Sequence, residues 1–256
     1  RSNGSISTRS VHAGEKREKA YNSLIEPIVQ SATYTFADTN DLRDYMDNTL
    51  LGMADDRTEY GRNGNPTVRA AERRIAALES AVDCVLFNSG MAAITTSLLA
   101  FLGAGKHLIL TRDSYRRSHQ FCLNVLKRFG VTCSTVPVGD YKALEEAITP
   151  ETKLIFSETP TNPYLRCIDL ECLVDIAKRN DVLSVIDSTF ATPFNLQPLE
   201  YGVDLVVHSG SKYLGGHNDI LAGAVCGQEH LTGLIRQLLG IMGSIMAPEQ
   251  ASLLIR

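Results

Sequence analysis

Residues 183–219, LSVIDSTFATPFNLQPLEYGVDLVVHSGSKYLGGHND, determine how the rest of this chain is interpreted. They contain two short apolar runs, 183–186 and 204–207, which end abruptly in polar residues as buried parallel strands do. Asp187 follows the first run, and Lys212 follows the second after two serines and a glycine. Because open α/β sheets bind ligands at the carboxyl ends of their strands, we expect these side chains at one ligand-binding edge.

A carboxylate and an amine at one sheet edge are typical of a site for pyridoxal phosphate (PLP). The PLP aldehyde condenses with a lysine amine, its ring nitrogen stays protonated beside a carboxylate, and its phosphate accepts hydrogen bonds from hydroxyls and backbone N–H groups. Taken singly, Asp187 also fits a cap or turn, and Lys212 also fits a solvated loop charge. In combination they favour PLP as the cofactor.

The string SGSKYLGGHNDILAG, preceded by VIDSTFATP, resembles the lysine region of the PLP enzymes of cysteine and methionine metabolism. This family includes cystathionine synthases and lyases, methionine lyases and homoserine sulfhydrylases, and the letters GGHND are most similar to plant-type cystathionine gamma-synthases. The resemblance runs from SVHAG (10–14) to the last residue. It implies a three-layer α/β/α large domain of the aminotransferase-like fold type I, with a mostly parallel sheet. It also implies that Lys212 binds the cofactor and that Asp187 holds the ring nitrogen protonated.

Composition limits the other classes of protein. The chain has 256 residues, 44% of them hydrophobic, which suffices for one large α/β domain. Its 25 basic and 29 acidic residues include no basic run, so we expect neither a nucleic-acid nor a membrane partner. Six scattered cysteines without a CxxC pair indicate no disulfide framework and no zinc site, which favours a cytoplasmic location. There is no apolar run of transmembrane length, and the first residues of the sequence show no signal-peptide h-region. Because the sequence does not begin with Met, removal of a plastid-targeting segment is an alternative.

Two regions differ in pattern. Residues 1–58 show no sustained hydrophobic periodicity, which predicts an arm with one short helix near 41–47. The pattern of residues 59–256 predicts the large cofactor-binding domain. In the resembling family this arm wraps a neighbouring subunit. The resemblance therefore implies self-association as at least a dimer, and as a dimer of dimers in the full assembly.

The loop YGRNGNPT (60–67) precedes a predicted helix with Asn65 as its N-cap and Pro66 in its first turn. On composition alone, Tyr60 packs on its own turn and Arg62 is a solvated charge. In the resembling family, the matching tyrosine and arginine reach the phosphate of the partner subunit's cofactor, a task that suits the bidentate guanidinium. Each active site would then need two chains.

A predicted strand at 82–87 turns sharply into a predicted helix at 92–102, and the turn contains Ser89, Gly90 and Met91. Unpaired N–H groups at a helix N-terminus form an anion site, although SGM is also an ordinary turn. The resemblance implies a phosphate cradle made by this turn together with the Ser209 and Ser211 hydroxyls.

Tyr115 lies between a predicted strand at 107–110 and a predicted amphipathic helix that extends to about residue 128. Half-buried packing is one reading of such a tyrosine, whereas in the family the matching tyrosine stacks on the cofactor ring and serves proton transfer to the leaving group. Arg116 and Arg117 stand where methionine lyases place a cysteine just beyond this tyrosine, which argues against a methionine lyase. We hypothesise a cationic wall for a phosphorylated substrate; two exposed arginines at a helix start are the alternative.

Strands predicted at 131–136, 153–156 and 222–226 and helices predicted at 141–148 and 170–180 continue the α/β alternation. The string ETPTNP (158–163) resembles the family's ESPTNP motif, which implies that Asn162 hydrogen-bonds the cofactor's ring hydroxyl. Asn before Pro is also common in turns for local reasons. The family's usual SATK is SGSK here, where Gly210 is expected to add backbone freedom.

Two histidines are expected to be structural. His217 and Asp219 have no further His or Cys cluster around them, so we expect no metal site, and His208 on its strand is expected to be a satisfied core residue. Family members continue into a smaller C-terminal domain that carries the arginine for the substrate carboxylate. No residue here takes that role by motif, so this domain is expected to be missing from a fragment of a longer protein.

The predicted function is that of a cystathionine gamma-synthase-like enzyme, with Lys212, Tyr115 and Asp187 as its catalytic residues. Small amino acids are its substrates: an activated homoserine ester and cysteine give cystathionine. A cystathionine γ- or β-lyase and an O-acylhomoserine sulfhydrylase share the same cofactor residues and remain alternatives. From a different class, a truncated, catalytically silent homologue could act as a binding subunit, but the retention of all three residues disfavours it.

Overall fold

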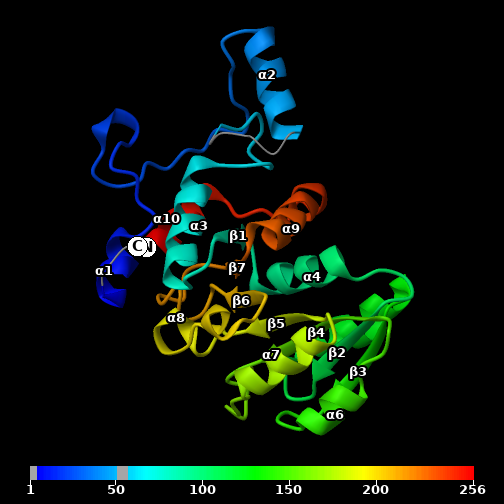
Figure 1. Ribbon diagram of the computed structural model, residues 1–256. Coiled ribbons are helices and arrows are strands. Elements are labelled where there is room, and N and C mark those ends of the chain that lie inside the picture. The colour runs from blue at the N-terminus through cyan, green and yellow to red at the C-terminus, as the bar shows by residue number, and fades with distance from the viewer. Residues whose placement is uncertain (1–4, 51–56) are drawn as a thin grey trace.

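The computed structural model describes residues 5–50 and 57–256, and its centre is a seven-stranded sheet between layers of helices (Figure 1). The strands, in chain order, are β1 (Asp83–Phe87), β2 (His107–Thr111), β3 (Thr132–Val136), β4 (Thr152–Glu158), β5 (Leu183–Asp187), β6 (Leu205–Ser209) and β7 (Gly223–Gly227). Their order across the sheet is β1-β7-β6-β5-β4-β2-β3. Among the described strands β7 runs antiparallel to both of its neighbours, β1 and β6, and the other four pairings are parallel, so the expected mostly parallel sheet is confirmed.

Helices cover both faces of this sheet, which confirms the expected three layers. The described α-helices are α1 (Ile6–His12), α2 (Thr39–Leu50), α3 (Pro66–Leu78), α4 (Gly90–Phe101), α5 (Arg116–Gln120), α6 (Tyr141–Glu146), α7 (Leu170–Arg179), α8 (Thr192–Asn195), α9 (Glu229–Met242) and α10 (Pro248–Ile255). One face packs against α4 and α9, while α7, and at the β1 end α3, cover the other. Because strand side chains alternate, Val185 belongs to the α4 core and Ile186 to the α7 core, so Asp187 faces α4.

Capping side chains start the two helices that lie nearest the predicted loops. The Asn65 side chain accepts hydrogen bonds from the N–H groups of Thr67 (2.9 Å) and Val68 (3.3 Å), and Pro66 occupies the first turn of α3, as expected. At the start of α4, Ser89 Oγ accepts from Ala92 N–H at 3.1 Å.

Two segments differ from the sequence-based expectation. The arm contains α1 as well as α2, and α2 has 12 residues. Asp38 Oδ1 accepts the N–H groups of Asn40 and Asp41 and starts this helix, most of whose residues are polar. The single amphipathic helix expected up to residue 128 is instead α5, followed by a π-helical turn, Phe121–Val125, and a 3₁₀ turn, Leu126–Phe129. Gly130, in the left-handed region with φ 75°, ends this segment.

The arm lies against α3 of its own chain. Arg74 donates to Ser10 O (3.1 Å) and to the Glu15 carboxylate (3.0 Å), and Thr67 Oγ1 bonds to the backbone of 27–29. The α2 helix projects away from the body (Figure 1), and Tyr21, ahead of it, is 97% exposed. The arm therefore leaves apolar surface uncovered, and its contact with a neighbouring subunit stays a prediction. Part of the predicted boundary region, residues 51–56, lies outside the described residues.

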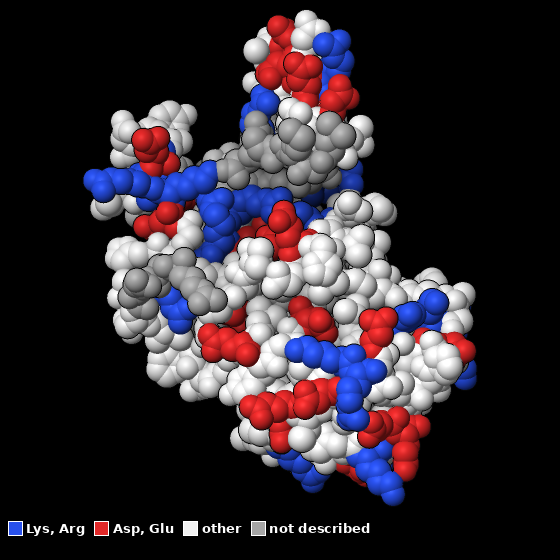
Figure 2. Space-filling view, in the orientation of Figure 1, with Lys and Arg blue, Asp and Glu red and all other residues white. Residues whose placement is uncertain are grey.

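The surface charges are mixed in sign. On the face shown in Figure 2, basic and acidic side chains alternate over the α6 and α7 region, and basic side chains also gather between α2 and the body. This distribution agrees with the small net charge of −4. Within the described residues, no helix combines the length and the apolar character needed to span a bilayer.

Candidate active site

Three adjacent parallel strands bring polar side chains to one edge of the sheet. Glu158 ends β4 directly opposite Asp187 at the end of β5, and Asp187 in turn lies opposite Val207 of β6, two residues before Ser209. The carboxyl ends of parallel strands meet at the same edge, so the predicted convergence on this edge is observed.

Asp187 is held in place by the residue two positions later. Thr189 donates both its N–H (3.0 Å) and its hydroxyl (2.5 Å) to Asp187 Oδ1, which leaves Oδ2 without a hydrogen-bond partner among the described residues. Burial raises the pKa of the Asp187 carboxyl, while the Thr189 hydrogen bonds and the nearby His208 act in the opposite direction.

Glu158 is a second buried carboxyl beside Asp187, with 4% of its surface exposed. Its Oε2 accepts the Tyr115 N–H at 2.6 Å. Burial, and secondly the charge of Asp187, raise the pKa of Glu158 to about 8, while the backbone of Asn162 lowers the pKa of the carboxyl.

Within the described chain, no lysine or arginine stabilises the charge of either carboxyl. In this part of the chain, the Oδ2 atom of Asp187 therefore has neither a hydrogen bond nor a lysine or arginine beside it. A protonated ring nitrogen would donate to this oxygen, so the site fits PLP.

The N-terminus of α4 packs closely against the end of β6. The first-turn N–H groups of Gly90 and Met91 have no intrahelical acceptor. A Cβ added to Gly90 would lie 2.7 Å from Ser209 Cβ and 2.9 Å from Ser209 Oγ, so a side chain at this position would collide with β6. The structure thus brings together four residues predicted to form the phosphate cradle: Ser89, Gly90, Met91 and Ser209.

The lysine loop follows β6 directly. Lys212 is exposed, and its carbonyl accepts the Gly216 N–H at 2.8 Å. Ser211 Oγ accepts the Ala222 N–H at 2.9 Å and contacts Ala222 O at 3.4 Å, so its hydroxyl ties the loop to the chain entering β7. Gly210 is not in the left-handed region, and a Cβ there would lie 2.8 Å from Ala222 Cβ. Glycine therefore permits close packing at this position, rather than the backbone freedom that we expected.

Tyr115 and Asn162 reach this edge from two different loops. Tyr115 immediately precedes α5 and is 40% exposed, and Asn162 is half-buried in a loop where both X-Pro bonds, Thr159–Pro160 and Asn162–Pro163, are cis. Arg116 and Arg117 are exposed beside Tyr115, and Arg117 bonds to the neutral Gln120 at 2.8 Å.

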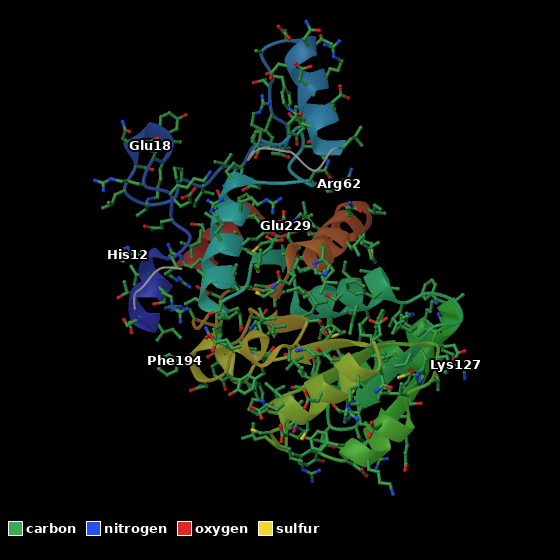
Figure 3. The ribbon with its side chains drawn as sticks, viewed as in Figure 1. His12, Glu18, Arg62, Lys127, Phe194 and Glu229 are labelled. Atoms are coloured by element: carbon green, nitrogen blue, oxygen red, sulfur yellow. The ribbon has the colours of Figure 1, made fainter. Side chains whose placement is uncertain are left out.

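Tyr60 and Arg62 lie elsewhere. Arg62 Nη1 donates to Gly240 O near the end of α9, and its guanidinium carbon lies 5.4 Å from the centre of the Tyr60 ring. Figure 3 shows Arg62 above α9, on the side of the projecting α2. Within one chain, these contacts of Tyr60 and Arg62 involve neither Asp187 nor Lys212.

The histidines behave largely as expected. His208 is fully buried, with Nε2 bonded at 2.5 Å to Glu79 Oε1. Its Nδ1 and Glu79 Oε2 have no partner among the described residues, so this core histidine is only half satisfied. Asp219 pairs with Arg256 at 2.8 Å, and His217 bonds to Gly215 O. In residues 5–50 and 57–256, no three His, Cys, Asp or Glu side chains gather as a metal site.

Two residues of this site, Glu158 and Thr189, were not predicted from the sequence. Glu158 carries a signal similar to that of Asp187, because it is an acid that follows a buried apolar run after one serine. Thr189 carries no comparable signal, because its role depends on the turn that folds it back onto Asp187.

Comparisons with known proteins agree with this geometry. The sequence profile of the family described as "Cys/Met metabolism PLP-dependent enzyme" matches residues 7–256. The chain is 41% identical to cystathionine gamma-synthase 1, chloroplastic, of Arabidopsis thaliana over all of its own length and 44% of that protein. It is 36% identical to a cystathionine beta-lyase of Lactococcus lactis over 98% of its length and 63% of that protein.

A solved structure gives the same result. Cystathionine gamma-lyase from Lactobacillus plantarum, complexed with L-serine, superimposes with a TM-score of 0.90 at 37% sequence identity. The match covers 99% of this chain and 63% of that structure, so the chain spans less than two thirds of each of these three relatives. The chain belongs to the family of PLP-dependent enzymes of cysteine and methionine metabolism.

Proposed function

We propose that this chain forms the cofactor-binding part of a cystathionine gamma-synthase-type enzyme, which joins an activated homoserine ester to cysteine. The observation that carries the proposal is that β5, which ends in Asp187, and β6, which leads into the Lys212 loop, end side by side where the N-terminus of α4 packs against Ser209. The similarity to a plant cystathionine gamma-synthase supports this choice of reaction. Because the chain spans only part of its relatives, the proposal concerns the whole protein.

Each residue of the edge has a role toward the cofactor. Lys212 would bind the aldehyde, the unpartnered Oδ2 of Asp187 would hold the proton of the ring nitrogen, and Asn162 would face the ring hydroxyl. The free N–H groups of Gly90 and Met91 and the hydroxyl of Ser209, beside Gly90, would hold the phosphate, with Ser89 capping the same turn. Ser211 would join them only by giving up its hydrogen bonds to Ala222.

Bound PLP supplies an electron-withdrawing ring that acidifies the Cα–H of an attached amino acid. The Lys212 amine would remove the Cα proton and then shuttle a proton at Cβ, taking it as the γ substituent leaves and returning it after the thiol has added at Cγ. The Tyr115 hydroxyl would protonate the leaving group, and the thiol of cysteine would take that group's place at Cγ.

A lysine substitution tests this proposal. Lys212→Ala should abolish turnover and the visible absorbance of bound PLP together, whereas Lys142→Ala, on an 86% exposed side chain, should change neither. Wild-type absorbance or turnover in Lys212→Ala would count against the assignment. Assays of the whole protein with homoserine esters plus cysteine, with cystathionine and with sulfide separate the synthase from the lyases and the sulfhydrylase.

We also propose that Tyr60 and Arg62 complete the site of a second copy, and that the arm contacts that copy. Their position on the α9 side, with no contact to their own lysine loop, supports this. Arg62→Ala and Lys212→Ala damage different chains of such a shared site. Mixing the two inactive variants should therefore restore activity, because hybrid dimers contain one intact site. No recovery in a confirmed hybrid dimer would refute the sharing.

For the compartment we propose the cytoplasm, with the plastid as the alternative because the Arabidopsis relative is described as chloroplastic.

A further inference from the structure

Glu158 occupies a position that none of the roles above uses. It is buried at the end of β4, and its side chain faces α4 together with Asp187, its neighbour on β5. A buried carboxyl with no cationic partner is costly to keep, so its hydrogen bonding indicates what it does.

The observed hydrogen bond joins two segments. The loop after β2 donates the Tyr115 N–H at 2.6 Å to Glu158, the last residue of β4, and Asn162 lies in the loop that follows β4. Below this link, Thr111 Oγ1 and Ser157 Oγ are 2.8 Å apart, and at the surface Arg166 pairs with Asp113 at 2.9 Å. Glu158 is thus the buried middle connection between the segments that carry Tyr115 and Asn162.

We propose that Glu158 is a positioning residue, which accepts the Tyr115 N–H and so fixes Tyr115 against the strand end that leads to Asn162. This inference rests on the proposed roles of those two residues. Without the acceptor, the Tyr115 N–H loses its partner, and the loop that carries Tyr115 is free to move relative to Asp187 and Asn162.

The function requires an acceptor oxygen and not a charge. Burial and the neighbouring Asp187 raise the pKa of Glu158 to about 8, so the group is protonated at neutral pH and its carbonyl oxygen remains the acceptor. A glutamine amide offers the same oxygen in nearly the same shape. A leucine fills similar space but accepts no hydrogen bond.

The test compares Glu158→Leu with Glu158→Gln in the whole protein. The dissociation constant for PLP and the visible circular dichroism of the bound cofactor, which reports how the ring is held, are measured beside the melting temperature. We expect Glu158→Leu to raise the dissociation constant at least tenfold and to reduce the dichroism, while Glu158→Gln keeps the constant within threefold and the dichroism near wild type. Glu146→Ala, whose side chain is 68% exposed, is the control and should match wild type.

Wild-type binding and dichroism in Glu158→Leu would overturn the proposal, and so would an equal loss in a folded Glu158→Gln. Glu158→Ala replaces the leucine variant should that variant not fold. The readout is cofactor binding, so failure of the whole protein to convert homoserine esters would refute the proposed reaction and leave this test intact.

Discussion

Gly90→Ala is expected to damage the phosphate cradle without unfolding the protein. The added Cβ would lie 2.7 Å from Ser209 Cβ, 2.9 Å from Ser209 Cα and 2.9 Å from Ser209 Oγ, whereas ordinary contacts begin near 3.4 Å. The start of α4 and the end of β6 must therefore separate by about 0.7 Å. Two of the three close atoms cannot rotate away, because they are the Cα and Cβ of Ser209.

Overpacking of this kind costs about 1–3 kcal/mol. Since 1.4 kcal/mol corresponds to a factor of ten in a binding constant, a cost expressed mainly at the cradle raises the dissociation constant for PLP by roughly 10- to 100-fold. Pyridoxal, which lacks the phosphate, does not use the cradle. Its affinity should change by less than about threefold.

The assay titrates the cofactor-free protein with PLP and with pyridoxal and follows the visible absorbance. Gly103→Ala is the matched control, because it lies just beyond the other end of α4 and a Cβ there meets nothing within 4 Å. An equal loss of affinity for PLP and pyridoxal in Gly90→Ala would refute the cradle, and so would unchanged affinity for PLP.

Three further predictions follow from the same structure. In the cofactor-free protein, Glu158 has a pKa of about 8, against a value near 4.5 in the unfolded chain, so the folded state loses stability relative to the unfolded state as the pH rises from about 5 to 8. The melting temperature of Glu158→Gln should therefore rise relative to that of wild type across this range. A difference in melting temperature that does not change with pH would contradict this prediction. His208→Ala should lower the free energy of unfolding by about 3 kcal/mol or more, because it leaves buried Glu79 without its partner, and a loss under 1 kcal/mol in urea unfolding would be inconsistent with that pairing. In the whole protein, Arg116→Ala combined with Arg117→Ala should reduce the preference for phosphoryl over acyl homoserine esters by about fivefold, because each exposed charge contributes roughly 0.5 kcal/mol. Arg128→Ala is the control. An unchanged preference would rule out the cationic wall.

The strands were predictable because their signals are local. Short runs bounded by polar or glycine residues, apolar in all but β3, mark all seven described strands to within two residues, and Asn65 with Pro66 marks the start of α3. The strand order was not predictable, since β7 inserts between β1 and β6 through contacts between residues distant in the chain. The arm's helices were underestimated because they depend on capping by Ser5 and Asp38 and contain few apolar residues.

For the candidate site, the amino-acid sequence alone determined which side chains follow the strand ends: Asp187 after one run, Ser209 and Lys212 after the next, and a helix start at Gly90. These assignments depend on neighbours along the chain. Only the tertiary structure showed that Gly90 must lack a side chain because Ser209 lies against it, that Ser211 bonds to Ala222, and that Glu158 joins the loop of Tyr115 to the end of β4. The physical reason is that such contacts depend on which strands are adjacent and which face each side chain takes, and residues 43 or 119 positions apart meet only once the sheet has formed.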